Sequence, residues 1–235
     1  MKLKLIKKVD EADDVKSFFW EPETEIKFEP GQYFYYTLPK LNYPDDRGNT
    51  RHFTISSSPT EGNILRLTTK IQDDSSGYKK TLNELQIGDI LEGEGPQGEF
   101  KIPNTKLQMP NIFVAGGIGI TPFRSMLKYS IDKNLSTPMY LLYSNSDLDF
   151  VFKKELDEWG VNIEYINTSV SGRIDKLKIL TFIKKYELEN VHANAIKDCM
   201  FWISGPPSFV SGIEDVLESL KIDSDNIKTD KFIGY

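Results

Sequence analysis

The chain has 235 residues, which is enough for one large or two ordinary domains with a buried core. Its formal net charge of −6 at pH 7 argues against nucleic acid as the main partner. No apolar run approaches the roughly 20 residues of a membrane-spanning helix, and the N-terminal residues lack the apolar segment of a signal peptide. We therefore expect a soluble cytoplasmic protein without a membrane span.

The cysteine and histidine content restricts the possible chemistry. Cys199 is the only cysteine, which excludes a disulfide framework and a four-cysteine iron–sulfur site. His52 and His192 share no metal-ligand spacing with it, so we predict no metal site. Any redox chemistry must then use an organic cofactor. Arginine is scarce beside lysine, and its five positions are candidate anion contacts: Arg47, Arg51, Arg66, Arg124 and Arg173.

Residues 1–105 have the pattern of a β domain. Short β-rich runs alternate with clusters of Gly, Pro, Asp and Asn, which favours a small closed barrel of six antiparallel strands. One short helix is expected at Lys79–Leu85. The predicted strands are Lys2–Val9, Val15–Trp20, Gln32–Leu38, His52–Ser56, Ile64–Ile71 and Ile90–Gly93.

The run Arg51-His52-Phe53-Thr54-Ile55-Ser56-Ser57 is the first candidate binding segment of this domain. In a strand, Arg51 and Phe53 would face one way, and His52 and Thr54 the other. An arginine, an aromatic ring and hydroxyls can bind a phosphate, stack on a flat ring and hydrogen-bond its edge. An exposed barrel strand with ordinary serines is the alternative.

A second candidate segment runs from Thr68-Thr69-Lys70 to Lys79. Its Ser75-Ser76-Gly77 turn enters the predicted short helix, so the N–H groups at that helix start could hold a phosphate. A polar loop with a serine N-cap explains this segment equally simply, and taken alone the residues favour that reading.

Residues 106–235 alternate between strand and helix patterns, which predicts a doubly wound α/β domain with a parallel sheet. Ligands of such sheets bind at the carboxyl ends of the strands. The predicted strands are Asn111–Ala115, Met139–Tyr143, Val161–Ile166, Met200–Ser204 and Ile227–Ile233, and the predicted helices are Pro122–Lys133, Phe150–Trp159, Lys176–Glu187 and Pro207–Leu220.

The first of these strands leads into three glycines within four residues, followed by Thr121 as the expected N-cap and Pro122 as the first helical residue. A strand, a glycine turn and a helix start together favour an anionic ligand such as a dinucleotide pyrophosphate. The spacing is not the G-x-G-x-x-G fingerprint, and a tight turn of any α/β domain is the alternative. The other strand ends add backbone turns, hydroxyls and an arginine: Ser144, Asn145, Arg173, Ser204 and Gly205.

Taken together, these motifs resemble the ferredoxin–NADP reductase superfamily of flavoproteins, over nearly the whole chain. RHFTISS is similar to the R-x-Y-S-x-x-S flavin motif of that family, and PGQYF, TTK, the Gly77 turn and GPQGEF follow in the family's order. AGGIGITPF, YSN, GRID and SGPPSFV resemble its pyridine-nucleotide motifs.

The resemblance implies roles for residues of the first domain toward FAD. Arg51 would clamp the pyrophosphate, Phe53 would stack on the isoalloxazine, and Thr54 would hydrogen-bond near flavin N5. His52 lies in the same motif and is counted with them. The remaining implied FAD contacts are Thr68, Thr69 and Lys70 on the ribose and adenine side, and Ser76, Gly77, Tyr78 and Lys79 at the diphosphate.

The resemblance also implies contacts to NAD(P) in the second domain. Thr121 would lie close to the flavin as well as to the nucleotide, and Tyr235 would cover the flavin ring until the nicotinamide displaces it. Thr54, Ser204 and Tyr235 are thus the expected catalytic residues. The implied nucleotide contacts are Gly117, Gly119, Ile120 and Thr121 at the pyrophosphate, Ser144, Asn145 and Arg173 near the adenosine, and Ser204, Gly205 and Pro206 near the nicotinamide.

Three positions depart from common family patterns. Ser204 stands where many members have Cys, and Ile233 stands where plant-type members have Glu. Ser146 stands where NADP-selective members often have Arg, although Arg173 could still read a 2′-phosphate. The sequence therefore leaves the choice between NAD(H) and NADP(H) open.

The resemblance implies an FAD-dependent oxidoreductase that takes a hydride from NAD(P)H and passes electrons to a separate carrier such as ferredoxin or flavodoxin. Lys79, Lys80 and Lys101 would be candidates for a docking patch, or ordinary solvated lysines. One alternative is a reductase subunit of a multicomponent oxygenase or dehydrogenase, or a free-flavin or quinone reductase. Another is a flavin- or nucleotide-binding module without turnover.

Overall fold

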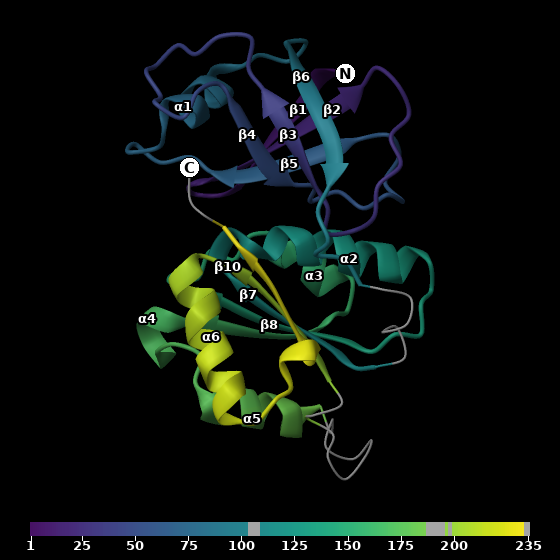
Figure 1. Cartoon of the computed structure of the whole chain (residues 1–235), viewed down its shortest axis with the longest axis vertical. Helices are drawn as coiled ribbons and strands as arrows, with labels where there is room; N and C mark the ends of the chain where they lie inside the picture. The colour runs from purple at the N-terminus through teal and green to yellow at the C-terminus, as the bar shows by residue number, and fades with distance from the viewer. Residues whose placement is uncertain (103–108, 187–195, 197–198, 233–235) are drawn as a thin grey trace. The chain divides into compact units, whose positions relative to one another are not determined.

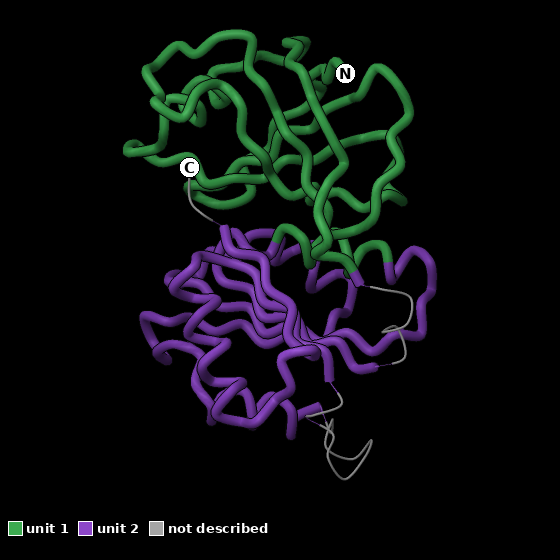
Figure 2. Tube along the Cα trace, in the orientation of Figure 1, with its two compact units in different colours: residues 1–101, 121–129, 235 green, residues 102–120, 130–234 purple. Residues whose placement is uncertain are grey.

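The chain forms two compact units in a computed structural model, which describes residues 1–102, 109–186, 196 and 199–232 (Figures 1 and 2). The first unit comprises residues 1–101 and 121–129, and the second comprises the other described residues. The expected domain boundary at residues 105 and 106 lies outside the described residues, as does Tyr235. No helix in the described ranges is long and apolar enough to cross a membrane.

The first unit is the antiparallel barrel that the sequence predicts. Its sheet has the strand order β4-β3-β6-β1-β2-β5 (Figure 1). The two end strands meet where Ile55 bridges Leu67 and the Ser56 N–H donates to the Arg66 carbonyl at 2.8 Å, which closes the barrel. The strands are β1 (Lys2–Ala12), β2 (Val15–Pro22), β3 (Tyr33–Thr37), β4 (Thr50–Thr54), β5 (Leu65–Lys70) and β6 (Ile90–Gln97).

Local contacts explain where the first unit departs from the predicted boundaries. Strand β4 begins at Thr50 rather than at His52, because Thr50 and Arg51 pair with β3. Helix α1 spans Gly77–Glu84 and starts two residues early, because the Ser76 side chain accepts from the Lys79 N–H and caps it. The buried core takes large side chains from both β-strands and α1, including Phe18, Trp20, Phe34, Tyr36, Tyr78 and Leu82.

The second unit is built on a parallel sheet with the strand order β11-β10-β7-β8-β9. All four neighbouring strand pairs are parallel, as the alternation of strand and helix patterns predicts. The strands are β7 (Asn111–Gly116), β8 (Met139–Asn145), β9 (Asn162–Asn167), β10 (Met200–Gly205) and β11 (Ile227–Lys231). The helices that follow them are α3 (Lys153–Glu158), α4 (Thr168–Ser171), α5 (Lys176–Lys185) and α6 (Pro207–Ser219), with a 3₁₀ turn, η5, at Ser224–Asn226.

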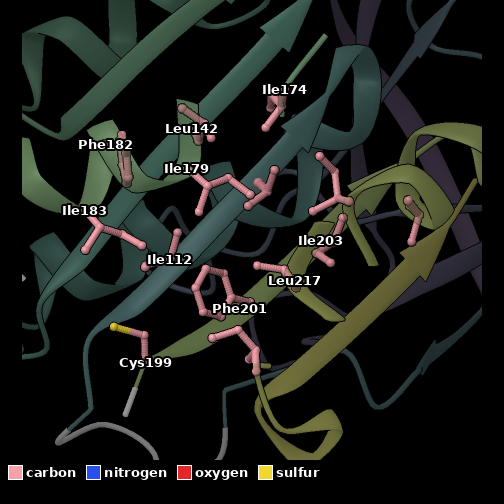
Figure 3. Packing of buried hydrophobic residues seen from close by; sticks show 14 of the residues in the cluster. Ile112, Leu142, Ile174, Ile179, Phe182, Ile183, Cys199, Phe201, Ile203 and Leu217 are labelled. Atoms are coloured by element: carbon pink, nitrogen blue, oxygen red, sulfur yellow. The ribbon is translucent and has the colours of Figure 1, made fainter. Parts of the chain in front are cut away.

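Helices α5 and α6 cover one face of this sheet. Alternate residues of the central strands, such as Ile112 and Leu142, join Phe182 of α5 and Leu217 of α6 in one buried cluster (Figure 3). Cys199 lies in this cluster just before β10 and is fully buried. On the opposite face, the Tyr143 ring of β8 meets the Phe150 ring edge-on, with the centroids 5.0 Å apart.

Two helix starts differ from the sequence expectation. Helix α2 spans Ile120–Asp132, so Thr121 is a helical residue and not the N-cap. The 3₁₀ turn η2 (Gly117–Gly119) runs directly into α2, and Pro122 is tolerated because the first turn of a helix needs no donor at that position. Helix α3 begins at Lys153, since Phe152 before it has the left-handed φ of 63°.

Candidate functional site

The glycine turn after β7 brings bare backbone to the carboxyl edge of the parallel sheet. Gly117 has a φ of +54°, a conformation that residues with a side chain rarely adopt. A Cβ added to Gly119 would lie 2.2 Å from the carbonyl oxygen of Ser204, so only glycine allows the turn to touch β10. The two glycines are therefore required by the turn itself and by its contact with the neighbouring strand.

Several predicted nucleotide contacts meet at this edge. The Oδ1 atom of Asn145 lies 3.8 Å from where a Cβ of Gly117 would be. Ser144 pairs in register with Gly116, and Ser204 pairs with Ala115. Ile120 and Thr121 are buried. Arg173 lies beyond α4 on an exposed segment, and the structure shows no hydrogen bond or ion pair of its side chain within the described residues.

Ser204 is the most unusual hydroxyl of this edge. The residue is 0 % exposed, and its Oγ atom has no hydrogen-bond partner among the described residues. The next carbonyl, that of Gly205, accepts from the Phe232 N–H at 2.9 Å, and Pro206 precedes helix α6. A buried hydroxyl without a partner is costly, so its place at the carboxyl edge fits a polar group of a bound nucleotide.

In the first unit, β4 shows the predicted alternation of its side chains. Arg51 and Phe53 both face Tyr78: the guanidinium carbon lies 5.3 Å and the Phe53 centroid 6.1 Å from the Tyr78 ring centroid. His52, on the other face, has its ring centroid 5.0 Å from that of Tyr33. Thr54 is 8 % exposed at the end of the strand.

The Arg51 guanidinium is held inside its own domain. Its Nη2 donates to Oδ1 of Asp45 at 2.5 Å, and its Nη1 donates to the backbone carbonyls of Arg47, Gly48 and Thr50 at 2.7–2.9 Å. The side chain of Arg51 is 2 % exposed and that of Asp45 is 4 % exposed. In this structure the guanidinium therefore shapes the loop before β4 and presents almost no surface to a ligand.

Asp45 also occupies the start of helix α1. Its Oδ2 accepts from the Tyr78 N–H at 2.9 Å, and a Cβ on Gly77 would lie 2.3 Å from the Pro44 carbonyl oxygen. Burial alone raises the pKa of Asp45, but the N–H groups of Tyr78 and Arg47 and the charge of Arg51 outweigh it and hold the pKa below its usual range. Residue patterns alone do not mark Asp45, and its place six residues before the candidate anion clamp Arg51 is the signal that the sequence offers.

The other buried arginines of the first unit are also paired with acids. Arg124 donates to Glu61 through both Nη atoms at 2.8 and 3.0 Å, and Arg66 donates to Glu11 at 2.6 Å. Arg51, Arg66 and Arg124 are each at most 4 % exposed. Buried arginines paired in this way connect parts of one domain.

A closed run of hydrogen bonds starts and ends at Arg66. Its Nε donates to Ser17 Oγ at 3.0 Å, and Thr68 Oγ1 lies 2.7 Å from Ser17 Oγ and 2.8 Å from Ser56 Oγ. Ser56 Oγ donates to the Arg66 carbonyl at 2.9 Å. Because a carbonyl only accepts, Thr68 must donate to Ser56 and Ser17 must donate to Thr68. The neighbouring Thr69 is also buried, and its hydroxyl lies 3.5 Å from the Lys70 carbonyl.

Lys79 differs from these arginines because it lacks an acidic partner. Its side chain is half-buried in the first turn of α1, and no ion pair of its ammonium is found among the described residues. Burial lowers the pKa of Lys79, the nearby charge of Lys70 lowers it further, and Asp74 only partly opposes them. A lysine at a helix start is also unfavourable for the helix dipole, so this cation fits an anionic group of a cofactor.

Two further expectations concern a metal site and the C-terminal residues. No group of His, Cys, Asp and Glu side chains suited to a metal ion occurs in the described ranges. Ile233 and Tyr235 lie outside the described residues, and so does His192. The roles implied for the C-terminal residues therefore stay predictions.

Comparisons with known proteins agree with this arrangement of two domains. Residues 2–102 match the family model of the oxidoreductase FAD-binding domain, and residues 113–215 match that of the oxidoreductase NAD-binding domain. The chain belongs to the ferredoxin–NADP reductase superfamily of oxidoreductases, and its cofactors are FAD and a nicotinamide nucleotide.

Individual relatives extend the comparison. Flavohemoprotein A of Dictyostelium discoideum is 27 % identical over 96 % of this chain and 58 % of its own length. The 2-halobenzoate 1,2-dioxygenase electron transfer component of Burkholderia cepacia is 27 % identical over 90 % of this chain and 61 % of its own length. The chain thus spans about three fifths of these relatives. The solved ferredoxin-NADP+ reductase from Plasmodium falciparum shares the fold, with a TM-score of 0.77, 22 % identity and coverage of 98 % of this chain and 95 % of that one.

Proposed function

We propose that this protein takes a hydride from NADH or NADPH onto FAD and passes the electrons to a separate one-electron carrier such as ferredoxin or flavodoxin. The observation that carries the proposal is the union in one chain of an FAD-binding barrel and an NAD-binding parallel sheet. FAD supplies the redox chemistry when bound, since it accepts an electron pair and can release the electrons singly. The protein supplies binding, orientation and exclusion of water.

The carboxyl edge of the parallel sheet would hold the nicotinamide nucleotide. The backbone at Gly117 and Gly119 would accommodate the pyrophosphate, because neither residue carries a side chain of its own. The Ser204 hydroxyl, which has no partner among the described residues, would bond the nicotinamide end. Serine in place of cysteine keeps a hydrogen-bond donor at this position and removes a thiol that could be oxidised.

The barrel would hold FAD through groups with different tasks. Lys79, with Lys70 beside it, would meet the diphosphate charge, because its ammonium forms no ion pair with an acid of the described residues. Arg51 would act on this site through the loop that it shapes with Asp45. Thr54 would donate a hydrogen bond to the flavin, and Phe53 and the terminal Tyr235 would supply ring surfaces.

A second candidate is a reductase component of a multicomponent oxygenase. The names of two relatives favour it: the 2-halobenzoate 1,2-dioxygenase electron transfer component and the phenol hydroxylase P5 protein of Acinetobacter pittii. Either acceptor would need a docking surface on this acidic chain. Lys101 is a weak contributor to such a surface, because its ammonium pairs with Glu29 at 2.5 Å.

Anaerobic reduction of the bound flavin tests the proposal. The purified protein is loaded with FAD and mixed with NADH or NADPH while the flavin absorption is followed. We expect one of the nucleotides to bleach it, and ferredoxin or flavodoxin to reoxidise it faster than free flavin or quinone does. A protein that takes up no FAD, or whose flavin stays oxidised with both nucleotides, would contradict the proposal. Reoxidation by an oxygenase component alone would favour the second candidate.

A further inference from the structure

The loop after β8, residues 146–150, lies next to the glycine turn. Asn145, the last residue of β8, joins the two segments. Its Oδ1 lies 3.8 Å from the position of a Cβ on Gly117, and its Nδ2 donates to Oδ1 of Asp147 at 2.8 Å and to the Asp149 carbonyl at 3.1 Å. One amide side chain therefore fixes the loop beside the turn that accommodates the pyrophosphate.

The Asp147 carboxylate is held in one orientation. Its Oδ1 accepts from Asn145 Nδ2 and, at 3.0 Å, from the Asp149 N–H, while Oδ2 lies 3.3 Å from the Ser146 hydroxyl, which donates to it. Asp147 is exposed and forms no ion pair with a lysine or arginine of the described chain. Its negative charge is thus positioned by neutral donors, and Oδ2 keeps accepting capacity toward solvent.

Helix α4 supports the same loop from its other side. The Ser169 hydroxyl donates to the Ser146 carbonyl at 2.5 Å, and the Thr168 hydroxyl donates to the Asn145 carbonyl at 3.3 Å. The Asn167 side chain caps α4 by accepting from the Ser169 N–H at 2.9 Å. The loop that carries Asp147 is therefore fixed at both β8 and α4.

A carboxylate at this place distinguishes the two nicotinamide nucleotides. In an open α/β sheet the dinucleotide lies across the carboxyl ends of the strands, and an acid beyond the strand next to the glycine turn accepts from the 2′-hydroxyl of the adenosine ribose. A 2′-phosphate at the same position would bring two like charges together and remove the hydrogen bond. We infer that Asp147 makes this protein selective for NAD(H) by accepting the ribose 2′-hydroxyl and opposing a 2′-phosphate. The inference rests on the proposed function.

Arg173 is the residue that would produce the opposite selectivity. It follows α4, but no contact among the described residues positions its guanidinium. The next acid, Asp175, caps α5 by accepting from the Lys178 N–H at 2.8 Å and pairs with the Lys178 ammonium. The carboxylate of Asp147 is thus a charge that the described contacts hold in place without an ion pair.

Binding of AMP and of adenosine 2′,5′-bisphosphate to the FAD-loaded protein tests the inference without turnover. Isothermal titration should give tighter binding of AMP to the unaltered protein, by about tenfold or more. The change Asp147→Asn keeps the oxygen that accepts from Asn145 and Asp149 and alters only the contact of Oδ2 with the Ser146 hydroxyl, so the two contacts that fix the loop beside the turn are preserved. It should bring the two affinities close together, mainly because the bisphosphate binds more tightly.

Matched variants separate this reading from a general charge effect. Asp149→Asn removes an acid from the same loop and keeps the backbone carbonyl that accepts from Asn145, so it should leave the ratio of affinities nearly unchanged. Preference for the bisphosphate in the unaltered protein, or an unchanged ratio in Asp147→Asn, would overturn the inference. A loss of bisphosphate affinity in Arg173→Ala together with such a preference would assign selectivity to Arg173.

Results that contradict the proposed function differ from results that contradict only the selectivity for NAD(H). A protein that binds neither AMP nor the bisphosphate, and whose flavin neither nucleotide reduces, would lose both the proposed function and this inference. Reduction by NADPH in strong preference to NADH would keep the proposed function and overturn the inference alone.

Discussion

The two units of this chain differ in the burial and ion pairing of the charged side chains near their candidate sites. In the barrel, Arg51 pairs with Asp45 and Arg66 pairs with Glu11, and all four side chains are at most 9 % exposed. At the carboxyl edge of the parallel sheet, Asp147 and Arg173 are exposed, and neither forms an ion pair among the described residues. A buried ion pair has already lost its water and is satisfied internally, whereas an exposed charge on a fixed loop can still select a ligand.

This difference changes how the arginines of the sequence should be interpreted. Scarcity made every arginine a candidate anion contact, yet the buried ones have carboxylate partners within their own unit. Lys79 of the barrel, in contrast, is half-buried and forms no ion pair among the described residues. Burial and pairing, and not residue type alone, therefore decide which cations we propose as phosphate contacts. The following changes test this comparison, beginning with the largest expected effect.

Replacing the buried arginine should cost far more stability than replacing the exposed one. Arg51→Met leaves the Asp45 carboxylate buried without its guanidinium, which should lower the free energy of unfolding by about 3–5 kcal/mol. Arg173→Met should change it by at most about 0.5 kcal/mol. Urea denaturation of both variants measures the difference. A small loss of stability with a large loss of FAD affinity in Arg51→Met would restore the direct clamp role that the family resemblance implies.

The glycine turn should tolerate no side chain at Gly119, which is buried against β10. Gly119→Ala places a Cβ 2.2 Å from the Ser204 carbonyl oxygen, and the backbone shift should cost about 1–3 kcal/mol of unfolding free energy and weaken nucleotide binding. Gly212→Ala in α6 is the matched control, because nothing lies within 4 Å of its Cβ, and it should be neutral or stabilising by up to about 1 kcal/mol. Equal thermal stability of the two variants would show that the turn is looser than described.

Removing Lys79 should affect FAD binding more than removing the next residue, Lys80. Lys79→Ala should weaken FAD binding by about tenfold, because a charge-assisted contact to the diphosphate is lost. Lys80→Ala, one residue further along the same helix, should leave FAD affinity nearly unchanged. Quenching of flavin fluorescence on titration of the apoprotein measures both. Equal effects of the two substitutions would point to a diffuse electrostatic attraction instead of a specific contact.

The smallest effect should be an acid lability of the barrel. Burial alone raises the pKa values of Asp45 and Glu61, but the hydrogen bonds and charges of their partners hold both below the usual range. A carboxyl whose folded pKa is below its unfolded value, about 4, stabilises the fold above that pH and loses this contribution as the pH falls through the folded pKa. The urea concentration at the midpoint of unfolding should therefore decrease as the pH is lowered from about 5 to about 3.

A matched pair of variants assigns this pH dependence. Asp45→Asn should reduce both the stability at pH 7 and its dependence on pH, because the buried carboxylate is gone. Asp46→Asn, which alters the exposed neighbour, should leave the acid slope unchanged. A slope that is the same in all three proteins would place the titrating groups elsewhere.

Hydrophobic periodicity predicts most strands and helices of both units, because the alternation of buried and exposed side chains can be read from a short stretch of sequence. The boundaries that it missed depend on distant partners or on single backbone conformations. Strand β4 begins early because Thr50 and Arg51 find partners on β3, and α3 begins late because Phe152 adopts a positive φ. Helix α2 begins at Ile120 because a 3₁₀ turn feeds it, and sequence pattern alone does not distinguish such a turn from a capped start.

The glycine turn and the strand ends of the site were also predictable, since parallel strands bring their carboxyl ends to one edge. Residue patterns do not reveal Asp45 or Asp147, because the contacts of both depend on the path of a loop. Asp45 matters through its contact with the Tyr78 N–H, 33 residues away, and Asp147 matters through the Asn145 amide beside Gly117. Such contacts form only when the chain is folded, and no periodic pattern in the sequence indicates them.

The run of hydroxyls that starts and ends at Arg66 gives the barrel seam a fixed polarity. The Arg66 guanidinium can only donate at one end of the run, and the Arg66 carbonyl can only accept at the other. The hydroxyls of Ser17, Thr68 and Ser56 must therefore all donate in the same direction, and none can rotate independently of the others. Neighbouring polarised bonds strengthen one another, and deleting any single hydroxyl interrupts the whole ring of dipoles. The Thr68 hydroxyl already donates its proton to Ser56, so it could only accept a hydrogen bond from a nucleotide that reaches it.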